Sequence, residues 1–437
     1  MSNPLVTAPI LPTLLRLSAP GLLLVLFQSM VSVGDTYFIG RLGTAPLAGL
    51  ALVFPLLMLL QMTSAGAMGG GVSSAIARAL GAGNPERARR LVVHAMIIAA
   101  GMAAAFTVLL LLFARPLYRL LGGEGESLAN ALAYSNIIFA GAISVWLANT
   151  LSSILRGTGN MLVPALTLIV VACIQVPLSG SLVLGWGPMP QLGIAGAALS
   201  YVGAFALAAI VMAIVVFRPA SALRPRAGDF ALDGRLFGDI LRVGGLSVLN
   251  SVQTVLTAVV LTGFVGRFGP AALAGYGVGV RLELLQIPIV FAIGQALVVL
   301  VGTNIGAGNP ARAKTIAWAG TAFAAAICLG IGGTVAIFPL AWVGLFSTDA
   351  AVLDAGSRYL RIVGPFYPFL AAGIALYFAS QGAGSMLRPV LASTVRLAVV
   401  VIGGALATSL AAIFGVVASG ILVSAVLMTW FVARARW

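Results

Sequence analysis

Twelve apolar segments, each long enough to cross a lipid bilayer, constrain this sequence more than any other feature. About 20 apolar residues in a helix span the hydrocarbon core, where backbone polar groups must be hydrogen-bonded within the segment. Only 8% of the residues are charged, against roughly 25% in a soluble domain. We therefore predict an all-α polytopic membrane protein with transmembrane helices near 17–40, 46–77, 91–114, 129–155, 162–185, 193–217, 244–266, 272–303, 315–338, 360–380, 390–413 and 414–433.

The basic residues indicate the orientation of these helices. If the N-terminus is cytoplasmic, sixteen of the 24 Lys and Arg residues lie on the inner side, and two, Arg281 and Arg396, lie within spans. Six lie outside: Arg41, Arg115, Arg119, Arg267, Arg358 and Arg361. This bias follows the positive-inside rule, so we expect both termini in the cytoplasm. The net charge of +14 then suits anionic membrane lipids, and its scatter is not typical of a nucleic-acid surface.

The two halves of the sequence repeat each other. FIGRLGTAPLAG at 38–49 matches FVGRFGPAALAG at 264–275, GAGNPERA at 81–88 matches GAGNPARA at 306–313, and GTGNMLVP at 157–164 matches GAGSMLRP at 382–389. Six predicted helices separate equivalent points, so both halves enter the membrane in the same direction, with a substrate path expected between them. We predict an N-lobe at 1–217, a cytoplasmic linker at 218–242 ending in a short amphipathic helix, and a C-lobe at 243–437.

Of ten acidic residues, only Asp35 and Glu283 lie within predicted spans. An ionised side chain at membrane depth costs roughly 3 kcal/mol or more, so such residues usually face a cavity or a partner. Gln28, Ser32 and Asp35 are spaced to share one face of a helix. In a lumen that opens alternately to two sides, Asp35 can bind and release a proton; the alternative is a hydrated carboxylate at the outer interface near Arg41.

Several other polar or methionine side chains in the predicted spans have two alternative interpretations. Glu283 is either a coupling residue or a structural carboxylate held near a helix end, and Asn250 and Gln253 form either a binding face or an interhelical hydrogen-bond seam.

The GAGNP segments are predicted to be turns. No Walker, zinc or nucleophile motif is present, so neither a catalytic nor a metal site is predicted. Adaptable apolar lining, or simply core, is expected at Met30, Phe38, Met58 and Met62.

These motifs together resemble the multidrug and toxic compound extrusion (MATE) family over nearly the whole chain. The resemblance rests on the aspartate before FIGRLG, the paired GAGNPxRA loops, RGTGNMLVP, and LGIAGAALS at the sixth span. It implies two six-helix lobes and places the family's N-lobe proton site at Asp35. Where many members carry Asn and Asp in the fifth helix, this chain has Gln175 and Ser179. The NorM-like seventh-helix glutamate falls near Gln253 or Thr254, so the DinF-like, proton-coupled branch is closer.

The resemblance implies a secondary antiporter of a prokaryotic inner membrane that exports small lipophilic or cationic compounds in exchange for protons by alternating access. A proton serves as the coupling ion, no cofactor is expected, and the protein is expected to be a monomer. Sodium coupling is the alternative for the ion. A flippase for lipids or lipid-linked oligosaccharides is the alternative for the cargo, with Arg281 and Arg396 as candidates to hold a diphosphate. A membrane enzyme lacks its catalytic constellation here, and two rocking lobes argue against a channel.

Overall fold

The computed structural model describes residues 4–435 and 437, and within that part of the chain the regular structure is helical throughout, without a strand. Eleven helices are long and apolar enough to cross a membrane, and a bent pair, Gly125–Ala140 with Ala142–Gly157, makes a twelfth span if counted as one. The chain is therefore a multi-pass membrane protein, which confirms the predicted fold class. Its helices form two compact units, one from Ala19 to Gly244, the other from the residues up to Ser18 and from Gly245 onward.

One predicted boundary was wrong because an apolar window continues through a break between two helices, and two other segments differ in detail from the prediction. The segment predicted at 390–413 is two elements: α16 ends at Leu406, and α17 begins at Leu410 after the Ser409 hydroxyl caps it by accepting from Ala412 N (3.2 Å). The fourth span bends by 50° between α6 and α7. The amphipathic helix expected at the linker's end is instead the first part of α10, which is continuous over Gly234–Gly266.

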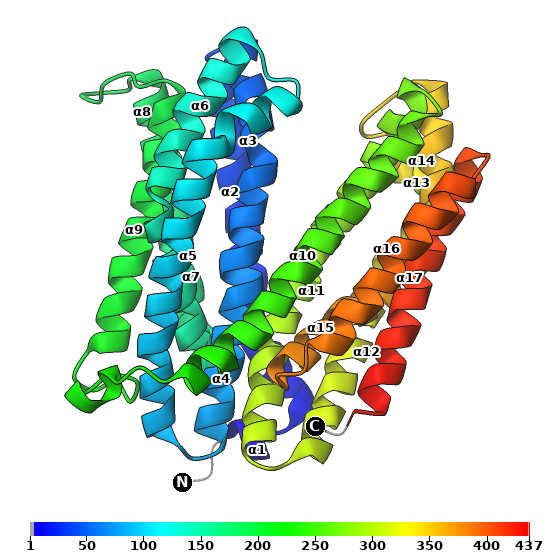
Figure 1. Ribbon diagram of the computed structural model, residues 1–437. Coiled ribbons are helices and arrows are strands. Elements are labelled where there is room, and N and C mark those ends of the chain that lie inside the picture. The colour runs from blue at the N-terminus through cyan, green and yellow to red at the C-terminus, as the bar shows by residue number, and fades with distance from the viewer. Residues whose placement is uncertain (1–3, 436) are drawn as a thin grey trace. The chain divides into compact units, whose positions relative to one another are not determined.

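The unit from Ala19 to Gly244 contains most of α2 and the first six predicted spans (Figure 1). Its largest fully buried side chains include Trp146, Tyr118 and Phe139, and Phe106 packs against Trp146. A π-helical segment, η1, separates α3 from α4 in the second span. The elements are α2 Ile10–Gly40, α3 Thr44–Gln61, η1 Met62–Met68, α4 Gly69–Gly81, α5 Pro85–Leu120, α6 Gly125–Ala140, α7 Ala142–Gly157, α8 Leu162–Leu184, α9 Ile194–Phe217 and the linker turn η2 Ala227–Phe230.

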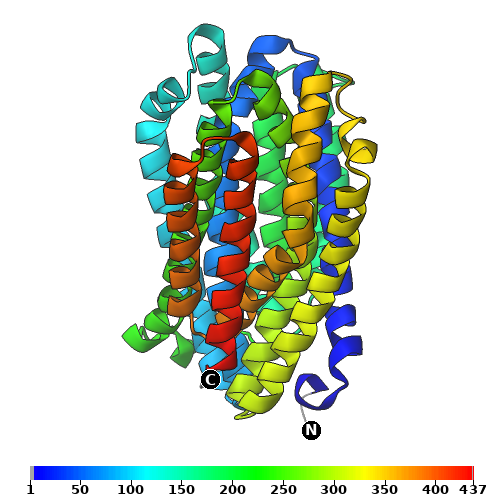
Figure 2. The same ribbon diagram turned by 90° about the vertical axis from the view of Figure 1, so that its right-hand side faces the viewer.

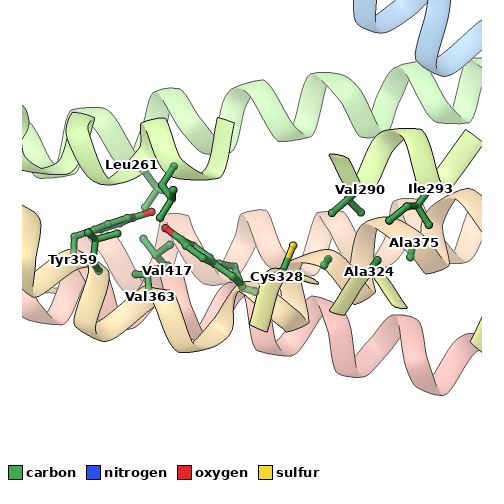
Figure 3. Close-up of a cluster of buried hydrophobic side chains, with 14 of the residues drawn as sticks. Leu261, Val290, Ile293, Ala324, Cys328, Tyr359, Val363, Ala375 and Val417 are labelled. Atoms are coloured by element: carbon green, nitrogen blue, oxygen red, sulfur yellow. The ribbon is translucent and has the colours of Figure 1, made fainter. Parts of the chain in front are cut away.

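The second unit contains the short helix α1 and the later spans; α16 and α17 lie side by side in Figure 2. Its core joins α11, α12, α14, α15 and α17, and Figure 3 shows Cys328 and Tyr359 among the aliphatic side chains. A 3₁₀ turn interrupts the tenth span at Gly364–Phe366. The elements are α1 Pro4–Thr7, α10 Gly234–Gly266 from Gly245 onward, α11 Pro270–Gly306, α12 Pro310–Ile337, α13 Pro339–Val343, α14 Ala350–Val363, η3 Gly364–Phe366, α15 Tyr367–Gly382, α16 Leu387–Leu406 and α17 Leu410–Ala433.

The two GAGNP segments are tight turns with the same chemistry in both units. Gly83 and Gly308 have φ of +69° and +72°, a left-handed conformation that glycine adopts without strain. Asn84 then caps α5 by accepting from the backbone N–H of Arg87 (2.8 Å), and Asn309 caps α12 in the same way. A proline follows each cap at the first helical position, where no backbone donor is needed. The predicted turns are confirmed, and the shared geometry agrees with the duplication.

Candidate functional site

Asp35 lies on α2 and is buried between α2 and α8, with 8% of its surface exposed. The hydroxyl of Ser179 donates to Asp35 Oδ1 over 2.6 Å, a short bond typical of a charge-assisted contact. The amide of Gln175 lies 3.5 Å from Oδ2, at the outer limit of a hydrogen bond. The two partners are four residues apart, so they share one face of α8. The carboxyl group is therefore held by neutral donors inside the protein.

Close helix packing fixes this contact. Gly180 follows Ser179 directly, and a Cβ atom built on it would lie 2.8 to 3.1 Å from three ring atoms of Phe38. Phe38, three residues after Asp35 on α2, is 9% exposed and also meets Trp186 edge-on. The absence of a side chain at Gly180 thus lets α2 and α8 approach where Asp35 and Ser179 meet. The hydrated alternative near Arg41 does not fit, because Asp35 is buried and Arg41 instead donates to the Tyr37 hydroxyl (2.9 Å).

The other residues expected around Asp35 lie differently. Gln28 and Ser32 are exposed on their unit, and among the described residues their side chains donate no hydrogen bond to Asp35. Met30 and Met58 are 64% and 40% exposed, and Met62 is partly buried at the start of η1. Phe38, by contrast, belongs to the core. The structure therefore brings together Asp35, Gln175 and Ser179, and it leaves the two methionines at the surface of the unit.

A polar network that we did not predict lies near Asp35. Tyr201 is close enough to interact electrostatically with Asp35, and its hydroxyl accepts from Gln61 (2.6 Å). Asn149 in turn donates to Gln61 Oε1 (3.1 Å) and to Ser64 Oγ (2.8 Å). Ser64 lies in the π-helical segment η1, and such segments frequently occur at functional sites. Amide side chains inside apolar spans are the sequence signal for this network.

Glu283 on α11 has a different environment from Asp35. Its carboxylate accepts a hydrogen bond from the Tyr359 hydroxyl on α14, and it interacts electrostatically with Arg396 on α16. Among the described residues, the buried Arg396 Nε atom has no hydrogen-bond partner. Gln286, which shares the helix face with Glu283, is buried and donates to the carbonyl of Leu282 (3.4 Å). A tyrosine and an arginine from two other helices thus hold this acid.

Asn250 and Gln253 connect α10 to α16. Asn250 accepts a hydrogen bond from the Ser393 hydroxyl, and the Gln253 amide donates to Thr394 Oγ1 (2.7 Å). This is the interhelical seam that the sequence offered as one interpretation. Among the described residues, no group of three or more His, Cys, Asp or Glu side chains is placed to hold a metal ion.

The comparisons with known proteins agree with this architecture. The MatE family model matches residues 20–179 and again 247–407. A protein named FAD transporter from Shewanella oneidensis is 29% identical over 86% of this chain and 82% of its own length. The probable multidrug resistance protein NorM of Thermotoga maritima is 24% identical over 88% of this chain and 82% of its own length. A solved MOP superfamily transporter from Pyrococcus furiosus has the same fold, with a TM-score of 0.91, 23% identity and coverage of 98% and 96%. Because the family model matches both halves and most of the chain, this protein belongs to the MatE family and is a multi-pass membrane transporter, not an enzyme.

Proposed function

We propose that this transporter is a secondary efflux antiporter that exports lipophilic, often cationic compounds in exchange for protons, with Asp35 as the proton-binding group. The observation that carries the proposal is a carboxyl group buried in a membrane span and held by neutral partners, Ser179 and Gln175. Such a group at membrane depth is a functional candidate by default. The multidrug resistance name of the Thermotoga relative supports drug efflux as the activity.

In this mechanism the proton changes what holds α2 to α8. An ionised Asp35 accepts the short hydrogen bond from Ser179, whereas a protonated carboxyl group carries its own donor and forms a weaker, neutral bond. Loss of the charge lets α2 repack or bend and lowers the affinity of the lumen for its cargo. Gln28 and Ser32, exposed on the same helix, would hold the water that carries the proton to Asp35. Met30 and Met58 would give the cargo an adaptable apolar surface.

The donor set favours a proton over a sodium ion. A hard cation needs several converging oxygen atoms. Here one carboxylate meets a hydroxyl at 2.6 Å and an amide nitrogen at 3.5 Å, both oriented as donors. Sodium binding would require the Gln175 amide to turn and present its oxygen, because the Ser179 oxygen alone would add only one ligand to the carboxylate. Sodium coupling remains the alternative that a gradient experiment decides.

A second candidate cargo is a flavin dinucleotide, because the Shewanella relative, 29% identical to this chain, is named FAD transporter. FAD is anionic, so it would need a cationic contact in the transport path. The flippase alternative has the same need, and its two candidate arginines are both engaged. Arg281 lies over the Phe346 ring at 5.2 Å, and Arg396 interacts with Glu283. This engagement supports a lipophilic or cationic cargo over a diphosphate.

The remaining expectations complete the proposal. The positive-inside bias supports both termini in the cytoplasm, and the family supports the inner membrane of a prokaryote. Each unit buries its own core, so we propose that the transporter works as a monomer without a cofactor.

The test is efflux in inverted membrane vesicles with an imposed pH or sodium gradient, using a cationic dye and FAD as separate cargoes. Asp35→Asn should insert normally and lose export driven by the pH gradient. Asp354→Asn is the matched control, because Asp354 is a surface acid with 58% of its side chain exposed. If Asp35→Asn still exports in response to a pH gradient, the coupling assignment is wrong. Export that needs sodium alone would move the assignment to the other ion.

A further inference from the structure

The segment between α9 and α10 folds against the start of α5 and forms a groove of about 610 Å³. Its lining includes Arg89 from the first turns of α5 and Arg224 and Arg226 from the linker, together with Ser221. The linker and the first turns of α5 can be followed at the same end of the unit in Figure 1. The groove is therefore polar, basic and open to the surroundings.

One wall of the groove is fixed by ion pairs between α5 and the linker. Arg89 Nε donates to Asp229 Oδ2 (3.0 Å), and only 14% and 6% of the two side chains are exposed. The same carboxylate oxygen accepts from the backbone N–H of Arg226 (2.8 Å). Burial alone would raise the pKa of Asp229, but the Arg226 backbone donor and Arg89 outweigh it and hold that pKa below its usual value. His94 Nε2 accepts a hydrogen bond from the backbone N–H of Asp233, and Arg90 forms an ion pair with the Asp233 carboxylate. Both contacts attach the next part of the linker to α5.

The linker adds two further arginines to the lining of the groove. Arg224 and Arg226 are both exposed, and within the described part of the chain no acid forms an ion pair with either side chain. Asp229 forms its close ion pair with Arg89 and interacts with the Arg226 charge without a close ion pair. Two arginines that line one groove, of which Arg226 shares Asp229 with Arg89, supply the positive charge that a phosphate group requires.

Large apolar side chains are exposed on the same segment. Phe230 and Leu232 are 61% and 66% exposed, although neither belongs to a membrane span. Positive charge beside exposed apolar side chains is typical of segments that lie in the interface of a bilayer.

The position of the groove in the chain agrees with a place at the membrane interface. Span α9 ends at Phe217, four residues before Ser221, and span α5 begins at Pro85, which also lines the groove. The groove therefore lies beside the end of one membrane-spanning helix and the start of another, where a basic surface is expected to meet anionic headgroups.

We propose that this groove binds the headgroup of an anionic phospholipid, with Arg224 and Arg226 on the phosphate and with Phe230 and Leu232 inserted beside the acyl chains. A free phosphate ion would satisfy the arginines but would leave both apolar side chains in water, so the lipid is the better match. The bound lipid would hold the linker, and with it the start of α10, against the membrane surface.

The binding test uses the full-length protein and phosphatidylglycerol, with retained lipid counted by native mass spectrometry. A basic side chain near an anionic surface contributes about fivefold to affinity, so Arg224→Gln with Arg226→Gln should weaken retention about 30-fold. The control removes the same charge with Arg235→Gln and Arg242→Gln, two exposed arginines outside the groove lining, and should retain the lipid. Equal loss in both double variants, or in neither, overturns the proposal.

A second measurement separates lipid from free phosphate. Phe230→Trp adds one fluorophore to the six native tryptophans, and brominated phosphatidylglycerol in vesicles should quench the added emission. Inorganic phosphate in large excess should leave this quenching unchanged. If the added emission is not quenched, or if phosphate abolishes both quenching and lipid retention, the groove is not a lipid site. These readouts do not depend on proton coupling, so they can fail while the proposed transport function stands.

Discussion

Replacing Gly180 with alanine should disturb the proposed proton site at Asp35 without changing any polar atom. The added Cβ would lie 2.8 to 3.1 Å from three atoms of the Phe38 ring, whereas carbon atoms prefer about 3.5 to 4.0 Å. The Phe38 ring, which is packed against Trp186, must therefore move by about 0.5 to 1 Å, and we expect part of this shift to reach the helix that carries it. The hydrogen bond from Ser179 to Asp35, now 2.6 Å, would lengthen beyond the usual range of about 2.5 to 3.0 Å for hydroxyl donors.

This geometry sets the expected changes in transport rate and in the free energy of unfolding. A hydrogen bond to a charged group contributes about 1.5 to 3 kcal/mol, which corresponds to a change of about 10- to 150-fold in whichever transport step uses it. Overpacking costs about 1 to 3 kcal/mol, and alanine returns about 0.5 to 1 kcal/mol because it favours a helix over glycine. The net loss of stability should be roughly 0.5 to 2 kcal/mol. For a unit of about 150 to 250 residues, this loss lowers the apparent Tm by roughly 1 to 8 °C.

The assay pairs proton-driven dye efflux in vesicles with thermal unfolding followed by tryptophan fluorescence. Gly203→Ala on α9 is the control, because a Cβ there meets nothing within 4 Å, and it should leave efflux unchanged. Phe38→Leu in the Gly180→Ala background removes the clashing ring atoms, and it should restore part of the efflux. Efflux at the parental rate in Gly180→Ala, or a double variant no better than the single one, would refute the link between helix packing and the Asp35 contact.

Two further predictions concern other parts of the protein. Gly279→Ala would place its Cβ 2.2 Å from the Tyr359 ring, and Gly277→Ala, two residues earlier in α11, would meet nothing within 4 Å. The first should lower the apparent Tm by several degrees, and the second should raise it slightly; equal Tm values would contradict the packing at Tyr359. For the linker, Asp229→Asn should cost about 1 to 3 kcal/mol at pH 7. Because the pKa of Asp229 is held below its usual value, the stabilisation is complete above about pH 3.9 and is lost as pH falls through the lower folded value. The Tm difference between parent and variant should therefore stay constant from pH 8 to pH 5 and shrink only below about pH 4, and a difference that shrinks between pH 8 and pH 5 would contradict this assignment.

The sequence predicts the number of spans well because each span must satisfy a length and a polarity that the bilayer imposes. It predicts their ends less well. Residues 407–409 form a turn, yet their neighbours on both sides are apolar, so a hydropathy window runs through them. The turns before Asn84 and Asn309 were predicted because glycine, asparagine and proline stand together there, and the structure adds that each asparagine caps the helix that follows.

The direction in which a membrane helix faces is harder to predict, because lipid and protein core are equally apolar. Phe38 was as good a candidate for a lining residue as Met30, and the structure buries Phe38 while Met30 is 64% exposed. The partners of Asp35 could be named only because a family resemblance pointed to Gln175 and Ser179. No local pattern relates Glu283 to Tyr359, which follows 76 residues later, so that contact could not be predicted.

The two acids within spans differ in how their charge is balanced, and this difference explains why we assign coupling to only one of them. Glu283 has an arginine, Arg396, within electrostatic range and a tyrosine hydroxyl bonded to its carboxylate. At Asp35, within the described part of the chain, the interacting groups are hydrogen-bond donors without a net charge. A buried charge needs compensation. The charge on Glu283 can be met by Arg396, whereas at Asp35 a mobile cation is left to supply compensation, and its arrival and departure can then drive a conformational change.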